Sequence, residues 1–132
     1  MPKISDNAAL QRAINPACLD RESLIDAYGG EGEWADEARA DLIRFRALRG
    51  KSLGRMSPAA LEAARCCFIF AAQWESSLAE ALGTADMEVA AESTRQAKLF
   101  NEVRIRRWGH TPFENQLANA IGIPLDRIGR HE

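Results

Sequence analysis

The sequence predicts an all-α fold: short N-terminal helices, a long antiparallel helical hairpin of about residues 58–82 and 86–108, and a short C-terminal helix. Apolar residues recur at spacings of three and four, few stretches alternate apolar and polar residues, and helix start and stop residues bracket the two long segments. A chain of 132 residues that is 46% apolar is enough for one domain. We expect residues 1–56 to hold N-terminal helices and a connector, 57–109 the hairpin, and 110–132 a short helix and a loose tail.

Three helices are predicted before the hairpin. The first runs from Asp6 to Ile14 and ends at Asn15-Pro16, because the residue before a proline is pushed out of helical dihedrals. The second runs from Asp20 to Tyr28 and stops at Gly29-Gly30. The third runs from Glu31 to Arg49, with acids at its start and arginines at its end, as the helix dipole favours. Its apolar side chains lie at spacings of three and four: Trp34, Ala38, Leu42, Phe45 and Leu48.

The hairpin is bounded by residues typical of helix ends. Ser57 fits the N-cap, Pro58 fits the first helical position, and Gly83 and Gly109 fit the left-handed residue that follows a helix. A three-residue turn separates the two long helices, and Asp86 begins the second. The remaining segments are a connector over Gly50–Met56, a last short helix over Pro112–Ala120, and a loose tail from Gly122.

The first hairpin helix is apolar on two faces between residues 63 and 74, where Arg65 and Gln73 are the only strongly polar side chains. Such a helix must be covered on two sides. Either the N-terminal helices cover the second face, or identical hairpins pack side by side, and the sequence leaves both open. In the second case the chain is a homo-oligomer, with interface residues Phe68, Phe70, Trp74 and Leu78.

Basic residues are concentrated in two segments of a chain whose net charge is -2. Cations gather at helix C-termini because the dipole favours them there, and they also contact phosphates in nucleic acids. We prefer the first segment as a site for double-stranded DNA, because two of its cations lie on the Gly50/Gly54 connector, where a flexible backbone would let them reach phosphates. The candidate DNA-binding residues are Arg44, Arg46, Arg49, Lys51 and Arg55, then Arg104, Arg106 and Arg107.

The sequence lacks the motifs of common enzymes and metal sites. There is no nucleophile elbow, phosphate-binding glycine loop, H-E-x-x-H helix or C-x-x-C pair. We therefore expect no enzymatic activity, no catalytic residues, no metal ligands and no cofactor. No window approaches 18 uninterrupted apolar residues, so no membrane partner is expected. Adjacent Cys66-Cys67 cannot readily bridge each other, which suits a reducing, cytoplasmic location.

Several motifs follow one another in a recognisable order through the middle of the chain. Trp34 lies in a preliminary helix, Met56-Ser57-Pro58-Ala59-Ala60-Leu61 opens a long helix that contains Phe70 and Trp74, and Gly109-His110-Thr111-Pro112-Phe113 follows the second long helix. This order resembles that of phage terminase small subunits over roughly residues 34–120. The resemblance implies a DNA-packaging subunit of the host-cell cytoplasm. Such a subunit forms rings through its hairpin, binds viral DNA, and regulates the large terminase subunit without catalysing a reaction.

A second function fits the same composition. A small non-enzymatic protein-binding module, such as a viral inhibitor, connector or regulatory subunit, would use its acidic N-terminal half, residues 20–41, to meet a basic partner. The two hypotheses differ in what the fold buries. A packaging subunit would bury Phe70 and Trp74 between copies and expose a basic band, whereas a monomeric module would bury them internally and leave an acidic face free.

Overall fold

The structure, a computed structural model, describes residues 4–122 and residue 124, and these residues form helices and no strand. The predicted all-α fold is therefore confirmed. The loose tail expected from Gly122 lies, apart from Gly122 and Pro124, outside the described residues. The elements in chain order are α1 (Asp6–Ala27), α2 (Glu33–Arg46), the short 3-10 helix η1 (Leu53–Arg55), α3 (Pro58–Leu82), α4 (Met87–Trp108) and α5 (Pro112–Ile121).

α1 is one continuous helix that contains Pro16, so the predicted break at Asn15-Pro16 and the separate helix over Asp20–Tyr28 are wrong. A proline inside a helix removes one hydrogen bond and costs about 3 kcal/mol. Burial of the apolar stripe outweighs that cost, because each fully buried aliphatic side chain contributes roughly 1.5–3 kcal/mol. The stripe continues on both sides of the proline: Ala9, Leu10, Ala13, Ile14, Ala17 and Cys18.

α2 is shorter than the predicted helix over residues 31–49. It starts at Glu33 and ends at Arg46, and turns follow it up to Gly50. Trp34, predicted on the inward stripe, lies in the first turn and is 58% exposed. The buried side of α2 is formed by Ala35, Ala38, Asp41, Leu42 and Phe45.

α3 and α4 form the predicted antiparallel hairpin, and their bounds agree with the sequence to within one residue. The Ser57 hydroxyl caps α3 by accepting from the Ala60 backbone N–H at 3.2 Å. Gly83 ends α3 at φ +48°, a conformation that favours glycine, and Asp86 is the N-cap of α4 rather than its first residue.

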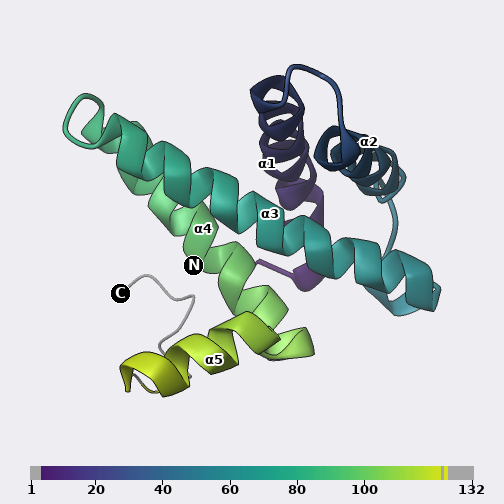
Figure 1. Cartoon of the computed structure of the whole chain (residues 1–132). Coiled ribbons are helices and arrows are strands. Elements are labelled where there is room, and N and C mark those ends of the chain that lie inside the picture. Colours follow the sequence, from purple (N-terminus) through teal and green to yellow (C-terminus); the bar gives the residue numbers. More distant parts are fainter. Residues whose placement is uncertain (1–3, 123, 125–132) are drawn as a thin grey trace.

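α3 is the central helix of the packing. It packs against α1 on one side and α4 on another, and α2 packs mainly against α1. In Figure 1 the closed end of the hairpin, near Gly83, extends past α1 and α2, and α5 lies at the opposite end of α4. Alanines at the contact surfaces permit close helix approach: Ala63, Ala64, Ala71 and Ala72 are all buried.

Both apolar faces of α3 between residues 63 and 72 are covered by other helices of the same chain. Phe68 is fully buried, with its ring centroid 6.3 Å from that of Phe100 on α4. Phe70 lies 6.1 Å from Phe45 on α2, and the Arg21 guanidinium stacks 3.7 Å above its ring. The predicted interface role of Phe68 is therefore wrong, and Phe70 is partly covered by the N-terminal helices of its own chain.

Replacing Pro16 with Ala tests whether packing holds α1 together against its proline. Alanine would restore the hydrogen bond to the Arg12 carbonyl, while the loss of proline's restriction on the unfolded chain would offset part of the gain. We expect Pro16→Ala to raise the free energy of unfolding by roughly 2 kcal/mol, measured by urea denaturation. Lower stability in this variant would show that the proline ring itself packs favourably.

Candidate functional site

Two cations of the first basic segment are paired with acids of the same chain. Arg44 forms an ion pair with Asp41 on α2, and Arg46 pairs with Glu22 on α1 at 3.1 Å. Both arginine side chains remain about half exposed. Their charges are locally balanced, so they contribute less to attraction of a polyanion than the sequence suggested.

Polar side chains of α1 hold the connector between α2 and α3 in place. The Gln11 amide accepts from the Gly50 backbone N–H at 2.9 Å and donates to the Leu48 carbonyl at 3.1 Å. The Asn7 amide oxygen accepts from the Leu53 backbone N–H at 2.9 Å. The connector is therefore fastened to α1, and the expectation that its backbone is flexible is wrong.

A third amide completes this contact. Asn15 accepts from the Arg49 guanidinium at 3.1 Å. The three amides follow one another at four-residue spacing, which places them on one side of α1, and we call them the amide ladder: Asn7, Gln11 and Asn15. Sequence reasoning missed this feature, although amides at positions i, i+4 and i+8 of a helix are a readable signal.

Arg49, Lys51 and Arg55, which we call the connector surface, form no ion pair with any acid in residues 4–122 or 124. All three residues are exposed. Lys51 and Arg55 line one side of an open hollow of about 520 Å³ at the start of α3, together with Ser52 and Ser57. These cations are held on a fixed backbone and remain available to an anionic partner.

The second basic segment is divided by the fold. Arg104 is only 6% exposed and donates to both carboxylate oxygens of Glu114, at 2.8 and 2.7 Å. Arg106 and Arg107 both pair with Asp6 at the start of α1. Arg104 is therefore a structural residue that joins α4 to α5, and its predicted role in DNA binding is wrong.

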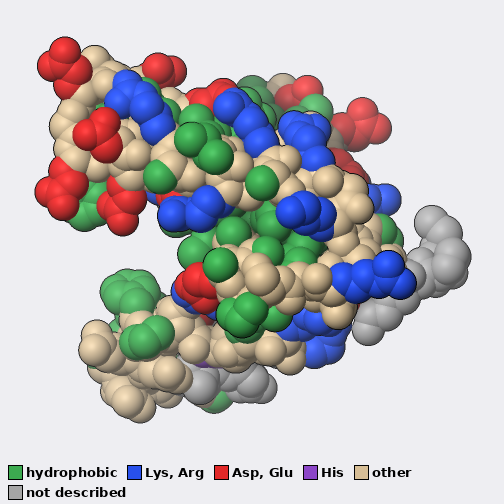
Figure 2. Space-filling view, turned by 90° about the vertical axis from the view of Figure 1, so that its right-hand side faces the viewer, with side chains coloured by type: hydrophobic (Ala, Val, Ile, Leu, Met, Phe, Trp, Pro, Cys, Tyr) green, Lys and Arg blue, Asp and Glu red, His purple; other side chains and the backbone are tan. Residues whose placement is uncertain are grey.

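The charged side chains do not form a continuous basic band on the face drawn in Figure 2. Lys and Arg side chains lie scattered among uncharged groups, and acidic side chains lie at the upper left and along the upper edge of the same view. Phosphate contacts on this chain therefore have to come from a small group of unpaired cations, since each exposed contact is weak and screened by salt.

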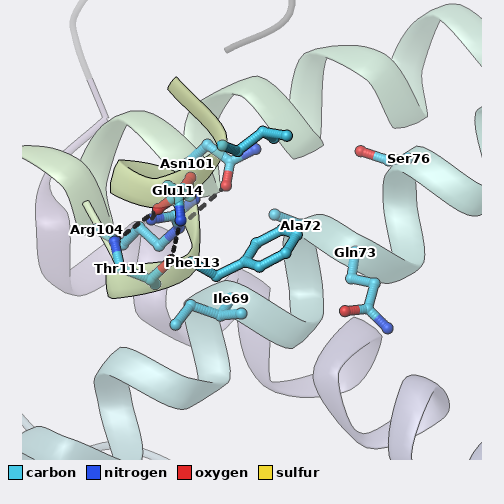
Figure 3. Close-up of a pocket in the computed structure, with 10 residues that line it drawn as sticks. Ile69, Ala72, Gln73, Ser76, Asn101, Arg104, Thr111, Phe113 and Glu114 are labelled. Carbon is cyan, nitrogen blue, oxygen red and sulfur yellow. Dashed lines mark hydrogen bonds and ion pairs between the residues drawn. The ribbon is translucent and has the colours of Figure 1, made fainter. Parts of the chain in front are cut away.

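A groove of about 330 Å³ separates α5 from the hairpin and is visible as a hollow in Figure 2. Figure 3 shows Asn101, Arg104 and Glu114 joined by hydrogen bonds on one side of it, and the Phe113 ring extending from α5 towards Ala72. The apolar walls come from α3 and α5. They are formed by Ile69, Ala72, Phe113 and Leu117.

Electrostatics and capping both hold Glu114 at the edge of this groove. Burial by itself would raise the pKa of Glu114, but hydrogen bonds from Arg104 and the Thr111 backbone N–H, with the nearby Arg104 charge, bring it below its ordinary value. The Thr111 hydroxyl accepts from the Glu114 backbone N–H at 3.2 Å, which completes a capping box. The T-x-x-E pattern was readable in the sequence, but the partner Arg104 was not.

Trp74 and Leu78 lie on the half of α3 that is nearer to Gly83, and each keeps part of its surface exposed. They line an apolar hollow of about 200 Å³. Its residues are spaced at i, i+3, i+4 and i+7 along one side of the helix, and we call them the hairpin stripe: Trp74, Ser77, Leu78 and Ala81. Of the four predicted interface residues, only Phe68 is fully buried, and Trp74 and Leu78 lie beyond the part of α3 that the N-terminal helices cover.

The metal-ligating side chains of the described residues are dispersed, and one thiol is deeply buried. No cluster of three or more His, Cys, Asp or Glu side chains that could hold a metal ion occurs there. Burial raises the pKa of the Cys67 thiol, which disfavours the reactive thiolate. No helix in the described ranges combines the length and apolar character needed to cross a membrane.

Comparison with known proteins does not assign this chain to a family. No family model, curated protein or solved structure matches it. What the chain does is therefore inferred from its own residues: the connector surface and the hairpin stripe.

The Arg104–Glu114 ion pair is expected to hold α5 against α4. Replacing Glu114 with Gln removes the charge that balances buried Arg104, and hydrogen bonds to charged groups contribute roughly 1.5–3 kcal/mol. Amide hydrogen exchange in residues 112–121 should therefore become at least about tenfold faster at neutral pH. Exchange in α3 should stay unchanged, because α5 can detach without unfolding the hairpin.

The same pair gives α5 a pH dependence of known sign. The folded-state pKa of Glu114 lies below its unfolded value of about 4.3. The stabilisation is therefore complete above that value and is lost as the pH falls through the folded pKa.

Glu37→Gln, at an exposed position with no ion pair to any described residue, serves as the control for Glu114→Gln in the hydrogen-exchange experiment. Equal protection of α5 in Glu114→Gln and in this control would contradict the anchoring role.

Proposed function

We propose that the chain is a non-catalytic phage DNA-packaging subunit, similar to terminase small subunits, that associates with copies of itself, binds double-stranded DNA and regulates the large terminase subunit. The observation that carries the DNA-binding part is the connector surface. Arg49, Lys51 and Arg55 have no acidic partner among the described residues, unlike most other arginines of the chain.

The amide ladder supports this role of the connector surface. Because α1 fixes the connector backbone, that backbone does not have to be ordered when DNA binds, and less conformational entropy is lost. Charge neutralisation at phosphates supplies affinity without reading sequence. Several copies in one assembly would multiply these contacts and offset the net charge of -2 of each chain.

The hairpin stripe supports self-association. Its apolar surface continues the side of α3 that is buried further along the helix, but it lies on the half of α3 that is nearer to Gly83. A partly exposed Trp and Leu at helical spacing are typical anchors of helix–helix interfaces. Here the neighbouring copy would provide the cover that α1 and α2 provide for Phe70.

A second candidate function is favoured by one observation on α2. Trp34 and Tyr28 are both more than half exposed at the end of the molecule where α2 begins. Acids without an ion pair in residues 4–122 surround them in sequence: Glu31, Glu33 and Glu37. Aromatic side chains amid acids suit a basic protein segment, as expected for a regulatory module that binds no DNA.

The DNA-binding proposal predicts a specific salt dependence. Replacing Arg49, Lys51 and Arg55 together with Ala should weaken duplex binding in fluorescence anisotropy. It should also flatten the slope of log K against log salt by about 0.9 for each phosphate contact that is lost. The control removes three ion-paired cations, Arg39, Arg65 and Arg95, and should change the slope little. Absence of duplex binding by the wild type at about 50 mM salt, where such contacts are strong, would sink the proposal.

Self-association predicts that Trp74→Asp lowers the molar mass of the assembly in light scattering while the helix content stays constant. A carboxylate buried without a partner in a dry interface costs several kcal/mol, enough to dissociate copies. Ile43→Asp, at a 71% exposed position on α2, should leave the molar mass unchanged. A wild-type molar mass equal to one chain would refute the self-association proposal and leave the monomeric binding module as the better description.

A further inference from the structure

Two serine hydroxyls line the hollow at the start of α3, beside cations of the connector surface. The Ser52 hydroxyl oxygen accepts from the Asn7 side-chain amide at 3.3 Å, and the Ser57 hydroxyl oxygen accepts from the Ala60 backbone N–H at 3.2 Å. Neither hydroxyl donates to an acceptor in residues 4–122 or 124. A hydroxyl carries one donor besides its acceptor lone pairs, so both O–H groups remain to donate to a ligand.

The same hollow carries positive charge that no acid balances. Lys51 and Arg55 are exposed and line it, and neither forms an ion pair with an acid in the described part of the chain. No Asp or Glu belongs to the described residues that line the hollow. Two cations and two hydroxyl donors around one space suit an anion with several oxygens, because each oxygen accepts a separate charge-assisted hydrogen bond.

One wall of the hollow is apolar, and the space exceeds what a simple inorganic anion needs. Met56 and Ala60 form this wall, and both are partly buried. The volume of about 520 Å³ lies within the roughly 300–1,000 Å³ of ligand pockets. A phosphate group that carries a sugar would use both parts, with its oxygens at the cations and hydroxyls and its sugar carbons against the apolar wall.

We propose that the hollow at the start of α3 binds a sugar phosphate, supplied by the backbone of a DNA strand. Lys51 and Arg55 neutralise the phosphate, the hydroxyls of Ser52 and Ser57 donate to its oxygens, and the sugar packs on Met56. This inference rests on the proposed function and deepens it, because it adds uncharged donors at the start of α3 to the cations of the connector surface. Such contacts position a DNA strand without reading its bases.

Deoxyribose phosphate is the probe, titrated into the ¹⁵N-labelled full chain with sodium chloride adjusted to keep the ionic strength constant. Screening of surface charges then stays the same throughout the titration. Backbone amide resonances of residues 50–60 should shift and saturate, while those of the hairpin near Gly83 should not move. Deoxyribose without the phosphate should cause no shift at the same concentrations, because it lacks the charge that Lys51 and Arg55 neutralise.

Matched variants separate the site from the fold. Ser57→Asp keeps a preferred N-cap residue at the start of α3 but places a negative charge in the hollow, so binding of the probe should fall at least about tenfold. Ser52→Ala removes one donor and should weaken binding about fivefold. Thr84→Asp adds the same charge at an exposed position beyond the far end of α3 and should leave binding unchanged.

Fluorescence anisotropy with a DNA duplex distinguishes failure of this inference from failure of the proposed function. Ser57→Asp and Ser52→Ala should both bind the duplex more weakly than Thr84→Asp. Duplex binding that these two variants retain as fully as Thr84→Asp would overturn the inference and leave the proposed function intact. Probe binding in residues 50–60 without any duplex binding would refute the DNA proposal and leave the hollow as a site for a free sugar phosphate.

Two results of the probe titration would also overturn the inference. The first is the absence of shifts in residues 50–60. The second is a set of shifts that do not saturate or that are equal in Ser57→Asp and the wild type, since these would reflect only general attraction of anions to exposed cations.

Discussion

The two-faced apolar surface of α3 is the constraint on which the rest of this structure depends. A helix that is apolar on two sides has to be covered twice, and here α4 covers one face while α1 and α2 cover the other. This requirement explains why α1 continues through Pro16. Its stripe must extend far enough to pack along α3, and burial of that stripe outweighs the lost backbone hydrogen bond.

The candidate sites consist of side chains that are not used to cover α3 and not engaged in ion pairs within the described residues. Arg21 stacks on Phe70 and pairs with Asp20, so an acid and a base of the N-terminal half complete the cover of α3. Other arginines form ion pairs with acids of their own helix or of a neighbouring one. The connector cations remain unpaired in the described ranges. The cover also ends before the tip of the hairpin, which leaves the hairpin stripe on the outside.

Sequence reasoning located the hairpin because its ends are determined locally, by Ser57, Gly83 and Gly109 acting on adjacent backbone groups. It divided α1 in error because the local effect of Pro16 was readable, whereas the packing that overrides it was not. The same limit applies to the sites. Arg104 and Arg106 look equivalent in a run of cations, and only the position of Glu114 on α5 shows that one of them is buried. The amide ladder bonds to connector residues about forty positions along the chain, and the periodicity of a helix predicts no contact at that sequence separation.

The most direct test of the account is native-state hydrogen exchange of residues 63–72, followed as the protein is diluted until only single chains remain. If α1, α2 and α4 cover α3 within one chain, amides in this segment will stay strongly protected in the single chains, although association at the hairpin stripe adds stability at higher concentration. Loss of this protection in the single chains would contradict the account, because it would mean that a second copy supplies one of the two covers.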